Sequence, residues 1–433
     1  MNDRTIAVVG LGYIGLPTAA VLASAGCRVV GIDISAHAVD TINAGRIHIV
    51  EPGLADIVAE TVGNGRFCAS TTPEPADAFL IAVPTPFREG YEPDLSYVEA
   101  AARSIAPCLK RGDIVILEST SPVGTTEQMT GWLAEGRPDL CFPTAVADTP
   151  VDVHVAYCPE RVLPGNVIVE LVSNDRVIGG MTAACSQAAA GIYRTFVKGE
   201  CVITDARTAE MCKLTENSFR DVNIAFANEL SMICDELSID VWELVALANR
   251  HPRVNILQPG PGVGGHCIAV DPWFIVHSSP RRARMIRLAR EINDAKPGWV
   301  IGKVDEVAQR LRAGRVIDGR LTVACLGLSF KADIDDLRES PAVAICGELA
   351  SLADYRVLAV EPHISHLPGA LAGAVELVDL DAALDAADIL LLLVDHREFR
   401  QFTTDNIDPA IVVDTRGTWR GLGARAPAPE AVG

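Results

Sequence analysis

The stretch TIAVVGLGYIGLPTAAVLASAGCRVVGID, residues 5–33, decides the fold of the N-terminal part of the chain. It begins with an apolar run, continues through a glycine-rich turn and a segment of small residues, and closes on a second apolar run. The glycines have the spacing G-x-G-x-x-G and are Gly10, Gly12 and Gly15. This order predicts a strand, a tight turn, a helix and a parallel strand, the βαβ unit in which backbone N–H groups can face a pyrophosphate.

Asp33 ends the second apolar run, 23 residues after Gly10. A carboxylate in this place would accept hydrogen bonds from both hydroxyls of a ribose and would repel a 2′-phosphate. We therefore expect the chain to bind NAD rather than NADP.

The remaining patterns predict an α/β protein with three parts. Alternating strands and helices continue to about residue 200 and predict a parallel sheet covered on both faces. Helical periodicity then dominates as far as about residue 311, which predicts a helical middle domain with a long central helix. LTVACLGLSF at 321–330 repeats the strand and glycine turn of the first part. We expect two Rossmann-like, doubly wound parallel-sheet domains, 1–200 and 313–433, flanking a helical domain at 201–312.

Composition excludes several classes of protein. With 37 basic and 56 acidic residues the formal charge is −19, which argues against a nucleic-acid or anionic-membrane partner. No apolar run is long enough to span a bilayer. The twelve cysteines include no C-x-x-C pair, so we expect reduced thiols in a cytoplasmic protein and no metal site.

One cysteine lies in a second glycine-rich stretch, PGPGVGGHCIAVDP at 259–272. The glycines permit close approach of a ligand to the backbone, and the loop could present Cys267 to a site with Asp271 four residues on. A thiolate is a nucleophile where cations or hydrogen bonds lower its pKa. From composition alone, a buried inert thiol explains the stretch equally well.

Local cations are needed for an acidic protein to bind anions. Lys213 and Asn217 are spaced i and i+4, which places them on one face of a helix. Ordinary surface charge is an alternative interpretation for each candidate. The others are Arg220, Arg253, Lys331 and Arg338.

Six motifs together give a specific resemblance. They are GLGYIGLPTA, VPTP, STSPVGTT, KLTENSFRDVNIAFANEL, GPGVGGHCIAVDPWF and FKADIDDLRESP. Their order and residues resemble the UDP-sugar 6-dehydrogenases over nearly the whole chain. Within that family, HPRVNILQPGPGVGGHCIAVDPWFI is most similar to members that act on UDP-N-acetyl-D-mannosamine. The resemblance implies an NAD-dependent four-electron oxidation of C6 to the uronic acid.

The resemblance also implies a covalent mechanism. Cys267 would attack the first-formed aldehyde to give a thiohemiacetal, and its oxidation would give a thioester that water releases. Lys213, aided by Asn217, would exchange the hydroxyl proton and stabilise the developing oxyanion. Asp271 would orient or deprotonate the lysine or a water, and Glu160 would assist thioester hydrolysis.

The resemblance also implies two sets of binding residues, one for NAD and one for the nucleotide sugar. The expected NAD site comprises Gly10, Gly12, Tyr13, Ile14, Gly15, Asp33, Thr85, Thr120 and Arg338. Thr120 would also help to hold water near the nicotinamide. The expected substrate contacts are Arg161, Val162, Lys213, Asn217, Arg220, His251, Arg253, Gly264 and Lys331, the last facing the diphosphate. Where UDP-glucose enzymes carry a second glutamate before a glycine, this chain has Pro164 and Gly165, which removes one acid.

Alternatives stay open at this point. UDP-N-acetylglucosamine or UDP-glucose could be the substrate, because spacing cannot separate sugar epimers. A single-step hydroxyacid dehydrogenase shares the layout but yields one NADH per substrate rather than two, and an NAD-binding sensor yields none. A homodimer through the long middle helix is expected.

Overall fold

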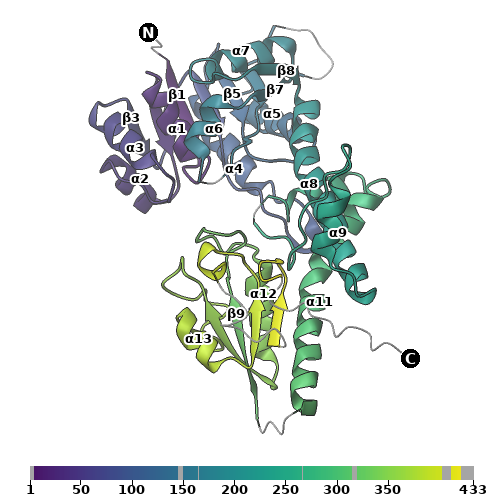
Figure 1. Ribbon diagram of the computed structural model, residues 1–433. Helices are drawn as coiled ribbons and strands as arrows, with labels where there is room; N and C mark the ends of the chain where they lie inside the picture. The colour runs from purple at the N-terminus through teal and green to yellow at the C-terminus, as the bar shows by residue number, and fades with distance from the viewer. Residues whose placement is uncertain are drawn as a thin grey trace. The chain divides into compact units, whose positions relative to one another are not determined.

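A computed structural model describes residues 4–144, 150–163, 165–265, 267–314, 319–401 and 411–420. The chain divides into two compact units, each made of two pieces of the sequence. The first comprises Met1–Glu216 and Trp273–Pro280, and the second comprises Asn217–Pro272 and Arg281–Gly433. Each unit carries a β-sheet with helices packed against it (Figure 1).

The sheet of the first unit has eight strands within the described residues, in the order β3-β2-β1-β4-β5-β6-β7-β8. Neighbouring strands are parallel except for β6 and β7, which pair antiparallel. The order reverses between β1 and β4, and such a reversal forms a ligand crevice at the carboxyl ends of the strands. The strands are β1 (Thr5–Val9), β2 (Arg28–Ile32), β3 (Phe67–Ser70), β4 (Ala78–Ile81), β5 (Ile114–Leu117), β6 (His154–Tyr157), β7 (Arg176–Gly180) and β8 (Cys201–Asp205).

Helices cover both faces of this sheet because successive residues of a buried strand point to opposite sides. In β1, Ile6 and Val8 pack with side chains of α1, α3, α6 and α7, whereas Ala7 and Val9 pack with those of α4 and α5. The helices are α1 (Gly15–Ser24), α2 (Ala36–Asn43), α3 (Leu54–Gly63), α4 (Ser96–Ile105), α5 (Thr125–Gly136), α6 (Val167–Ser173) and α7 (Ala183–Tyr193).

Long helices occupy the middle of the sequence. α8 (Ala206–Glu236) and α11 (Arg284–Gly314) are each 31 residues long. α9 (Val241–Ala248) follows α8 after a break, and α10 (Asp271–Ser278) begins four residues after Cys267. The break contains Ser238 in the left-handed region, with φ +55°, and Asp240, whose carboxylate caps α9 by accepting from the N–H groups of Trp242 and Glu243.

The second unit carries a parallel five-stranded sheet in the described residues, ordered β11-β10-β9-β12-β13. Its central strand is buried at every position, and α11 and α12 cover one face of it. The elements are β9 (Leu321–Leu326), α12 (Pro341–Ser351), β10 (Tyr355–Val360), β11 (Glu376–Leu377), α13 (Leu380–Ala386), β12 (Ile389–Leu392) and β13 (Val412–Asp414).

The expected fold class is confirmed, with two refinements. The helical periodicity expected after about residue 200 is interrupted at 237–240, where a side-chain cap starts a new helix. The first sheet also contains the antiparallel β6–β7 pair, which periodicity cannot distinguish from a parallel one. Within the described residues, no helix is both long and apolar enough to cross a membrane.

Candidate active site

The glycine turn between β1 and α1 is tightly packed except on one side. Gly10 has φ +89°, and a Cβ there would lie 2.5 Å from the Ala82 carbonyl oxygen. A Cβ at Gly15 would overlap the Gly10 carbonyl, whereas a Cβ at Gly12 would meet no atom of the described residues within 4 Å. The turn therefore requires glycine at the first and third positions for protein packing, and leaves open space beside Gly12 for a ligand.

Asp33 is held against this turn. One carboxylate oxygen accepts the Leu11 N–H over 2.8 Å, and the other accepts the Ser35 N–H over 2.8 Å. Each oxygen keeps a second lone pair, so the carboxylate is oriented and can still accept a hydrogen bond from a ribose hydroxyl.

Two of the expected cofactor residues meet at the carboxyl ends of β4 and β5. The Thr85 hydroxyl donates to the Thr120 carbonyl oxygen over 2.6 Å, which ties the two strand ends together. Tyr13, in the glycine turn, is 43% exposed, and Ile14 beside it is partly buried. Arg338 belongs to the second unit, where its guanidinium bonds to the Asp336 carboxylate at 2.7–3.1 Å.

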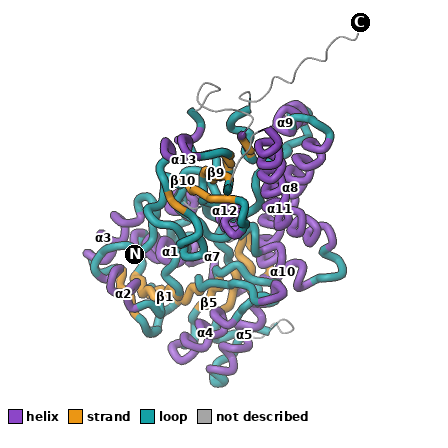
Figure 2. Tube along the Cα trace, turned by 90° about the horizontal axis from the view of Figure 1, so that it is seen from below, coloured by secondary structure: helices purple, strands orange, loops and turns teal. Residues whose placement is uncertain are grey.

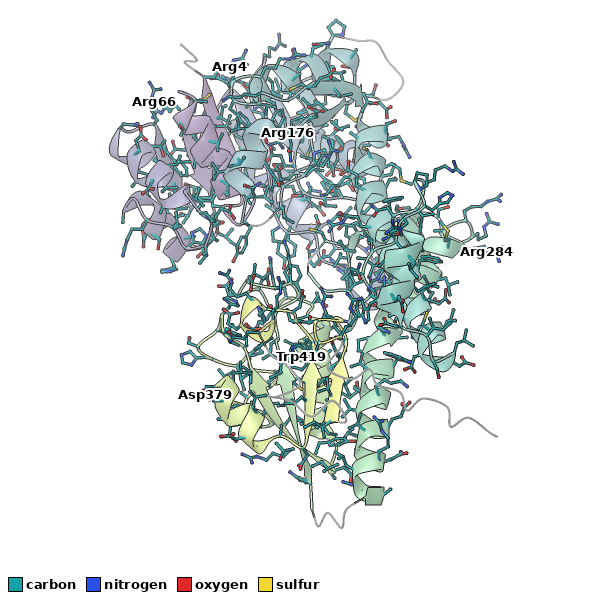
Figure 3. All side chains as sticks on the ribbon, in the orientation of Figure 1. Arg4, Arg66, Arg176, Arg284, Asp379 and Trp419 are labelled. Atoms are coloured by element: carbon teal, nitrogen blue, oxygen red, sulfur yellow. The ribbon has the colours of Figure 1, made fainter. Side chains whose placement is uncertain are left out.

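Glu160 follows β6 and is buried with both oxygens engaged. Oε1 accepts the Arg161 N–H over 2.7 Å, and Oε2 is paired with the Arg176 guanidinium over 2.8 Å. Arg176 lies in the interior of the first unit, with its guanidinium 5.4 Å from the centre of the Tyr193 ring (Figure 3). Glu160 is thus held in place by a cation on one oxygen and an N–H donor on the other.

Glu118, at the end of β5, belongs to the same buried cluster. The Tyr193 hydroxyl donates to its Oε1 over 2.7 Å, and its Oε2 has no hydrogen-bond partner among the described residues. Burial raises the pKa of Glu118 to about 7. Burial likewise raises the pKa of the neighbouring Cys158 thiol to about 12, so this cysteine is an inert thiol at neutral pH.

The two expected substrate residues next to Glu160 are both engaged in the first unit. The Arg161 guanidinium pairs with the Glu216 carboxylate at 2.8 Å and donates to the Asp175 carbonyl oxygen at 3.1 Å. Val162 packs against the apolar cluster that includes α1. Pro164, the departure from the UDP-glucose pattern, lies outside the described residues.

Asn217 and Asp271 are brought together from positions 54 residues apart. The Asn217 amide donates to the Asp271 carboxylate over 2.5 Å, and both side chains are buried. The Asp271 N–H donates to the Cys267 carbonyl oxygen over 2.9 Å, which fixes the turn that leads from the cysteine into α10. Lys213 lies one helical turn before Asn217 on α8 and is also buried, whereas the Cys267 residue is exposed. The expected catalytic residues Asn217, Asp271 and Cys267 thus come together within the second unit.

The glycine loop before Cys267 packs on the loop that joins β9 to α12. A Cβ at Gly264 would lie 2.7 Å from the Glu339 carbonyl oxygen and 2.7 Å from Phe330 Cβ. The Gly265 N–H donates to the Arg338 carbonyl oxygen over 3.1 Å. The loop that carries Lys331 and Arg338 therefore lies against the loop that carries the thiol.

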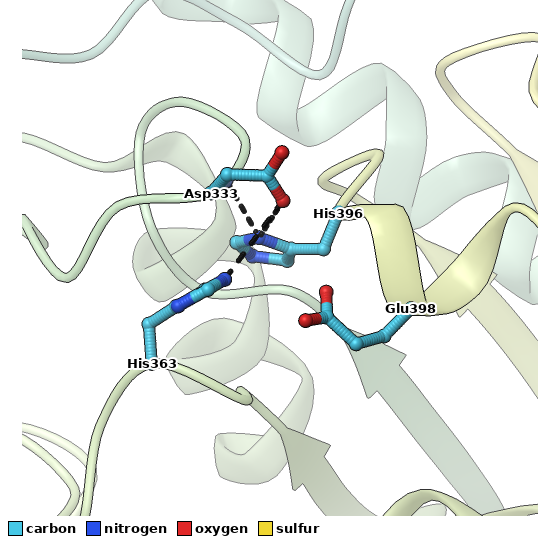
Figure 4. A group of neighbouring side chains, drawn as sticks. All are labelled: Asp333, His363, His396 and Glu398. Atoms are coloured by element: carbon cyan, nitrogen blue, oxygen red, sulfur yellow. Dashed lines mark hydrogen bonds and ion pairs between the residues drawn. The ribbon is translucent and has the colours of Figure 1, made fainter.

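The buried side chain of His396 is hydrogen-bonded to the loop that carries Lys331. His396 Nδ1 accepts the Asp333 N–H over 2.9 Å, so the ring carries its proton on Nε2, which lies 3.0 Å from a Glu361 oxygen. Figure 4 shows the Asp333 carboxylate directed toward both His363 and His396, at 3.9 and 3.8 Å. Glu361 also accepts the Leu328 N–H, over 2.7 Å, and so closes the turn after β9. The cluster fixes the backbone on which Lys331 is placed.

The remaining expected substrate residues are exposed. Arg220 lies on α8 beyond the buried pair, and its side chain reaches solvent. His251 and Arg253 are in the turn after α9, where the Arg253 N–H donates to His251 Nδ1 over 3.3 Å. Their positions leave them available to a ligand or a partner.

Comparison with known proteins gives three consecutive family matches. Residues 4–197 match the NAD binding domain of the UDP-glucose/GDP-mannose dehydrogenase family, 207–295 match its central domain, and 324–421 match its UDP binding domain. An NDP-N-acetyl-D-galactosaminuronic acid dehydrogenase of Ralstonia nicotianae is 64% identical over 97% of each chain. A UDP-N-acetyl-D-mannosamine dehydrogenase of Escherichia coli is 62% identical over 97% of this chain and 100% of the relative. The chain belongs to this dehydrogenase family.

Solved structures of family members share the fold over nearly the whole length. The UDP-D-ManNAc dehydrogenase of Pyrococcus horikoshii has a TM-score of 0.85 at 37% identity and covers 96% of both chains. The UDP-N-acetyl-mannosamine dehydrogenase of Staphylococcus aureus has a TM-score of 0.82 at 42% identity, covering 96% of this chain and 95% of that one.

As a family member, the chain is an NAD-dependent dehydrogenase whose cofactor-binding domain is its first sheet. The residues present fit that cofactor. The open space beside Gly12 leaves room for a pyrophosphate, and the oriented Asp33 carboxylate suits a ribose diol and opposes a 2′-phosphate. NAD accepts a hydride from the carbon that is oxidised.

Sequence reasoning missed several charged residues beside the expected ones. Arg176 begins a strand that is otherwise apolar, and an arginine at the start of a strand is usually interpreted as an exposed surface charge. Arg416 lies against the glycine loop, with Nη1 2.7 Å from the position of a Gly260 Cβ, and its Nε donates to Asp395 over 3.0 Å. A possible signal for Arg416 was its place just after the last apolar strand, at the same sheet edge as Lys331.

Proposed function

We propose that this dehydrogenase oxidises UDP-N-acetyl-D-mannosamine at C6 to the mannosaminuronate, using two NAD and one water and releasing two NADH. Relatives that carry the name UDP-N-acetyl-D-mannosamine dehydrogenase support the substrate, at 60–62% identity over 97% of this chain. The observation that carries the chemistry is the Asn217–Asp271 contact beside Cys267, because it supplies a buried polar pair next to an exposed thiol.

Cys267 is the proposed nucleophile. The first oxidation removes a hydride from C6 and the hydroxyl proton, which gives an aldehyde. Sulfur then bonds to that carbon to form a thiohemiacetal, which still carries one hydrogen that a second NAD can accept as hydride. The resulting thioester is cleaved by water, which supplies the second carboxylate oxygen and returns the thiol.

Lys213 and Asn217 are the proposed partners of the reacting oxygen. Lys213 would take the hydroxyl proton in the first oxidation, and Lys213 with Asn217 would stabilise oxyanion character in the later steps. Asp271 orients Asn217 through the 2.5 Å bond and would take up protons passed on by the lysine or a water.

Glu160 is the proposed residue for thioester hydrolysis. Its carboxylate, which is paired with Arg176, would align an attacking water and accept its proton. Thr120 is proposed to hold water on the nicotinamide side, since its carbonyl is tied to Thr85 at the sheet edge.

The residues that bind NAD and the nucleotide sugar are also proposed here. For NAD we propose Gly10, Gly12, Tyr13, Ile14, Gly15, Asp33, Thr85, Thr120 and Arg338. For the nucleotide sugar we propose Arg161, Val162, Lys213, Asn217, Arg220, His251, Arg253, Gly264 and Lys331. We also retain the division into an NAD domain at 1–200, a helical domain at 201–312 and a UDP-sugar domain at 313–433 as a proposal.

A homodimer through α8 is proposed on the strength of an exposed apolar stripe. Phe219, Phe226 and Ile233 recur every seven residues on this helix and are 68%, 51% and 45% exposed. A repeat of seven keeps one face of a helix directed at a partner, and exposed aromatic residues in such a row are typical of interfaces.

The Ralstonia relatives favour a second candidate substrate. Their names refer to N-acetyl-D-galactosaminuronic acid, and they are 63–64% identical to this chain over the same length as the mannosamine enzymes. The two sugars differ in the configuration at C2 and C4, which whole-chain identity cannot separate.

The test is a panel of nucleotide sugars with purified enzyme and NAD. UDP-N-acetyl-mannosamine, -galactosamine and -glucosamine and UDP-glucose are compared by NADH absorbance and by mass spectrometry of the product. Highest kcat/KM with the mannosamine derivative and two NADH per uronate are expected. Preference for any other sugar would overturn the substrate assignment, and one NADH per product would overturn the four-electron reaction.

A further inference from the structure

A row of buried polar side chains joins α8 to α11 inside the second unit, where the two helices lie side by side (Figure 2). Arg290 donates to Asp221 over 2.6 Å, and Asn293 donates to the same Asp221 oxygen over 2.8 Å. Asn228 in turn donates to Asn293 Oδ1 over 2.9 Å. All four side chains are at most 2% exposed, so the row is shielded from water.

Asn228 also reaches the glycine loop. Its Oδ1 accepts the Gly260 N–H over 2.9 Å, and this bond is buried. The orientation of the amide is determined by its partners, because the Asn293 amide nitrogen is already donating to Asp221. Asn293 can therefore offer Asn228 only its oxygen, and Asn228 must direct NH₂ to Asn293 and its own oxygen to Gly260.

The Gly260 bond fixes one end of a loop whose other end is fixed independently. At the far end, the Gly265 N–H bonds to the Arg338 carbonyl, two residues before Cys267. Between these points, a Cβ at Gly262 would lie 2.9 Å from Pro341, so the loop has little room to shift toward α12. Loss of the Asn228 bond would free the end that is attached to α8.

We propose that Asn228 is a positioning residue for Cys267: by holding Gly260 to α8, it sets the location of the thiol relative to the aldehyde. The inference rests on the proposed function, in which the thiol acts only after the first oxidation. A displaced loop therefore leaves the first hydride transfer intact and lets the aldehyde escape before sulfur can capture it.

Ser231 provides a matched control one turn along the same helix. Its hydroxyl accepts a bond of 2.5 Å from Lys296 of α11 and donates to the Asn228 carbonyl, and within the described residues its side chain makes no hydrogen bond to the glycine loop. Ser231→Ala thus removes a buried α8–α11 bond without removing the Gly260 contact.

The experiment compares Asn228→Ala with Ser231→Ala and the wild type, using UDP-N-acetyl-D-mannosamine, excess NAD and a hydrazine probe that captures free aldehyde. For Asn228→Ala we expect captured aldehyde per NADH to rise about tenfold and kcat for uronate to fall about tenfold, with KM within about twofold, because small misplacements of a reacting group act on kcat. Ser231→Ala is expected to match the wild type in aldehyde per NADH.

Equal aldehyde capture by the two variants would overturn the positioning role. If Asn228→Ala does not fold, Asn228→Leu, which fills a similar volume without an acceptor, takes its place with the same expected result. Cys267→Ala separates this inference from the proposed function: uronate formation by that variant would contradict the covalent mechanism itself, whereas a normal aldehyde ratio in the Asn228 variants alone would leave the mechanism standing.

Discussion

The Asn217 side chain donates to the Asp271 carboxylate over 2.5 Å, and the Asp271 N–H donates to the Cys267 carbonyl oxygen. The pair links the helix that carries Lys213 to the turn that carries the thiol. A buried carboxylate in that place can orient the Asn217 amide and take up protons from the reacting oxygen. The relationship gives Asp271 a role that is open to direct test.

Asp271→Asn keeps the shape of the side chain and removes its charge. We expect kcat to fall about 10²-fold with KM within about threefold, since a proton-accepting group is lost and binding contacts remain. Steady-state kinetics with the mannosamine substrate provide the measurement. An unchanged kcat would mean that the carboxylate only supports the fold.

Glu160→Gln is expected to slow thioester hydrolysis. The amide can still accept the Arg161 N–H but cannot accept a proton from water. Under excess NAD, the acyl adduct should accumulate on Cys267 and appear in the intact mass of the protein. The double variant with Cys267→Ala should show no adduct, and the absence of an adduct in the single variant, with uronate formed at the normal rate, would exclude Glu160 from this step.

Glu118 makes stability depend on pH. Its pKa is raised from the ordinary value of 4.5 to about 7 by burial, so the fold favours the protonated acid. The contribution of the protonated Glu118 to the free energy of unfolding is complete below the ordinary pKa and is lost as pH rises through 7. The loss reaches up to about 3 kcal/mol by pH 8.

Glu118→Gln is neutral at every pH and keeps an acceptor for the Tyr193 hydroxyl. The Tm of this variant should therefore rise relative to the Tm of the wild type by several degrees from pH 5 to pH 8. Glu60→Gln, on the exposed face of α3, serves as the control, and its Tm should differ from that of the wild type by the same amount at pH 5 and at pH 8. A pH-independent difference for Glu118→Gln would contradict the burial effect.

Phe226→Glu tests the α8 interface. Phe226 is half exposed in the described chain, so a charge there should leave the protomer folded but disfavour a packed dimer. Light scattering at micromolar concentration should report a dimer for the wild type and a monomer for the variant. The control Val202→Glu changes a similarly exposed apolar residue on β8, and this variant should stay dimeric. A monomeric wild type would contradict the proposed homodimer.

Local sequence determined much of the fold. β1, β2 and β9 lie in the apolar runs that were expected to form strands, because each is a short apolar run that ends at a glycine or an aspartate. The break between α8 and α9 was missed since it depends on the Asp240 side chain capping a new helix inside a continuous apolar pattern.

The site was harder to reach from sequence. Asp33 could be placed because its partner turn lies on the neighbouring strand, within one βαβ unit. The contact between Asn217 and Asp271 spans 54 residues and depends on tertiary packing, which no spacing rule describes. Arg176 and Asn228 look ordinary in the sequence, and only burial beside Glu160 and Gly260 reveals what they touch.

The covalent role of Cys267 is tested most directly by product stoichiometry. Wild-type enzyme and Cys267→Ala are each incubated with UDP-N-acetyl-D-mannosamine and excess NAD, and NADH, uronate and hydrazine-captured aldehyde are counted. Two NADH per uronate are expected from the wild type, and from the variant no uronate and at most one NADH per captured aldehyde. Uronate from Cys267→Ala with two NADH per molecule would contradict the thioester mechanism.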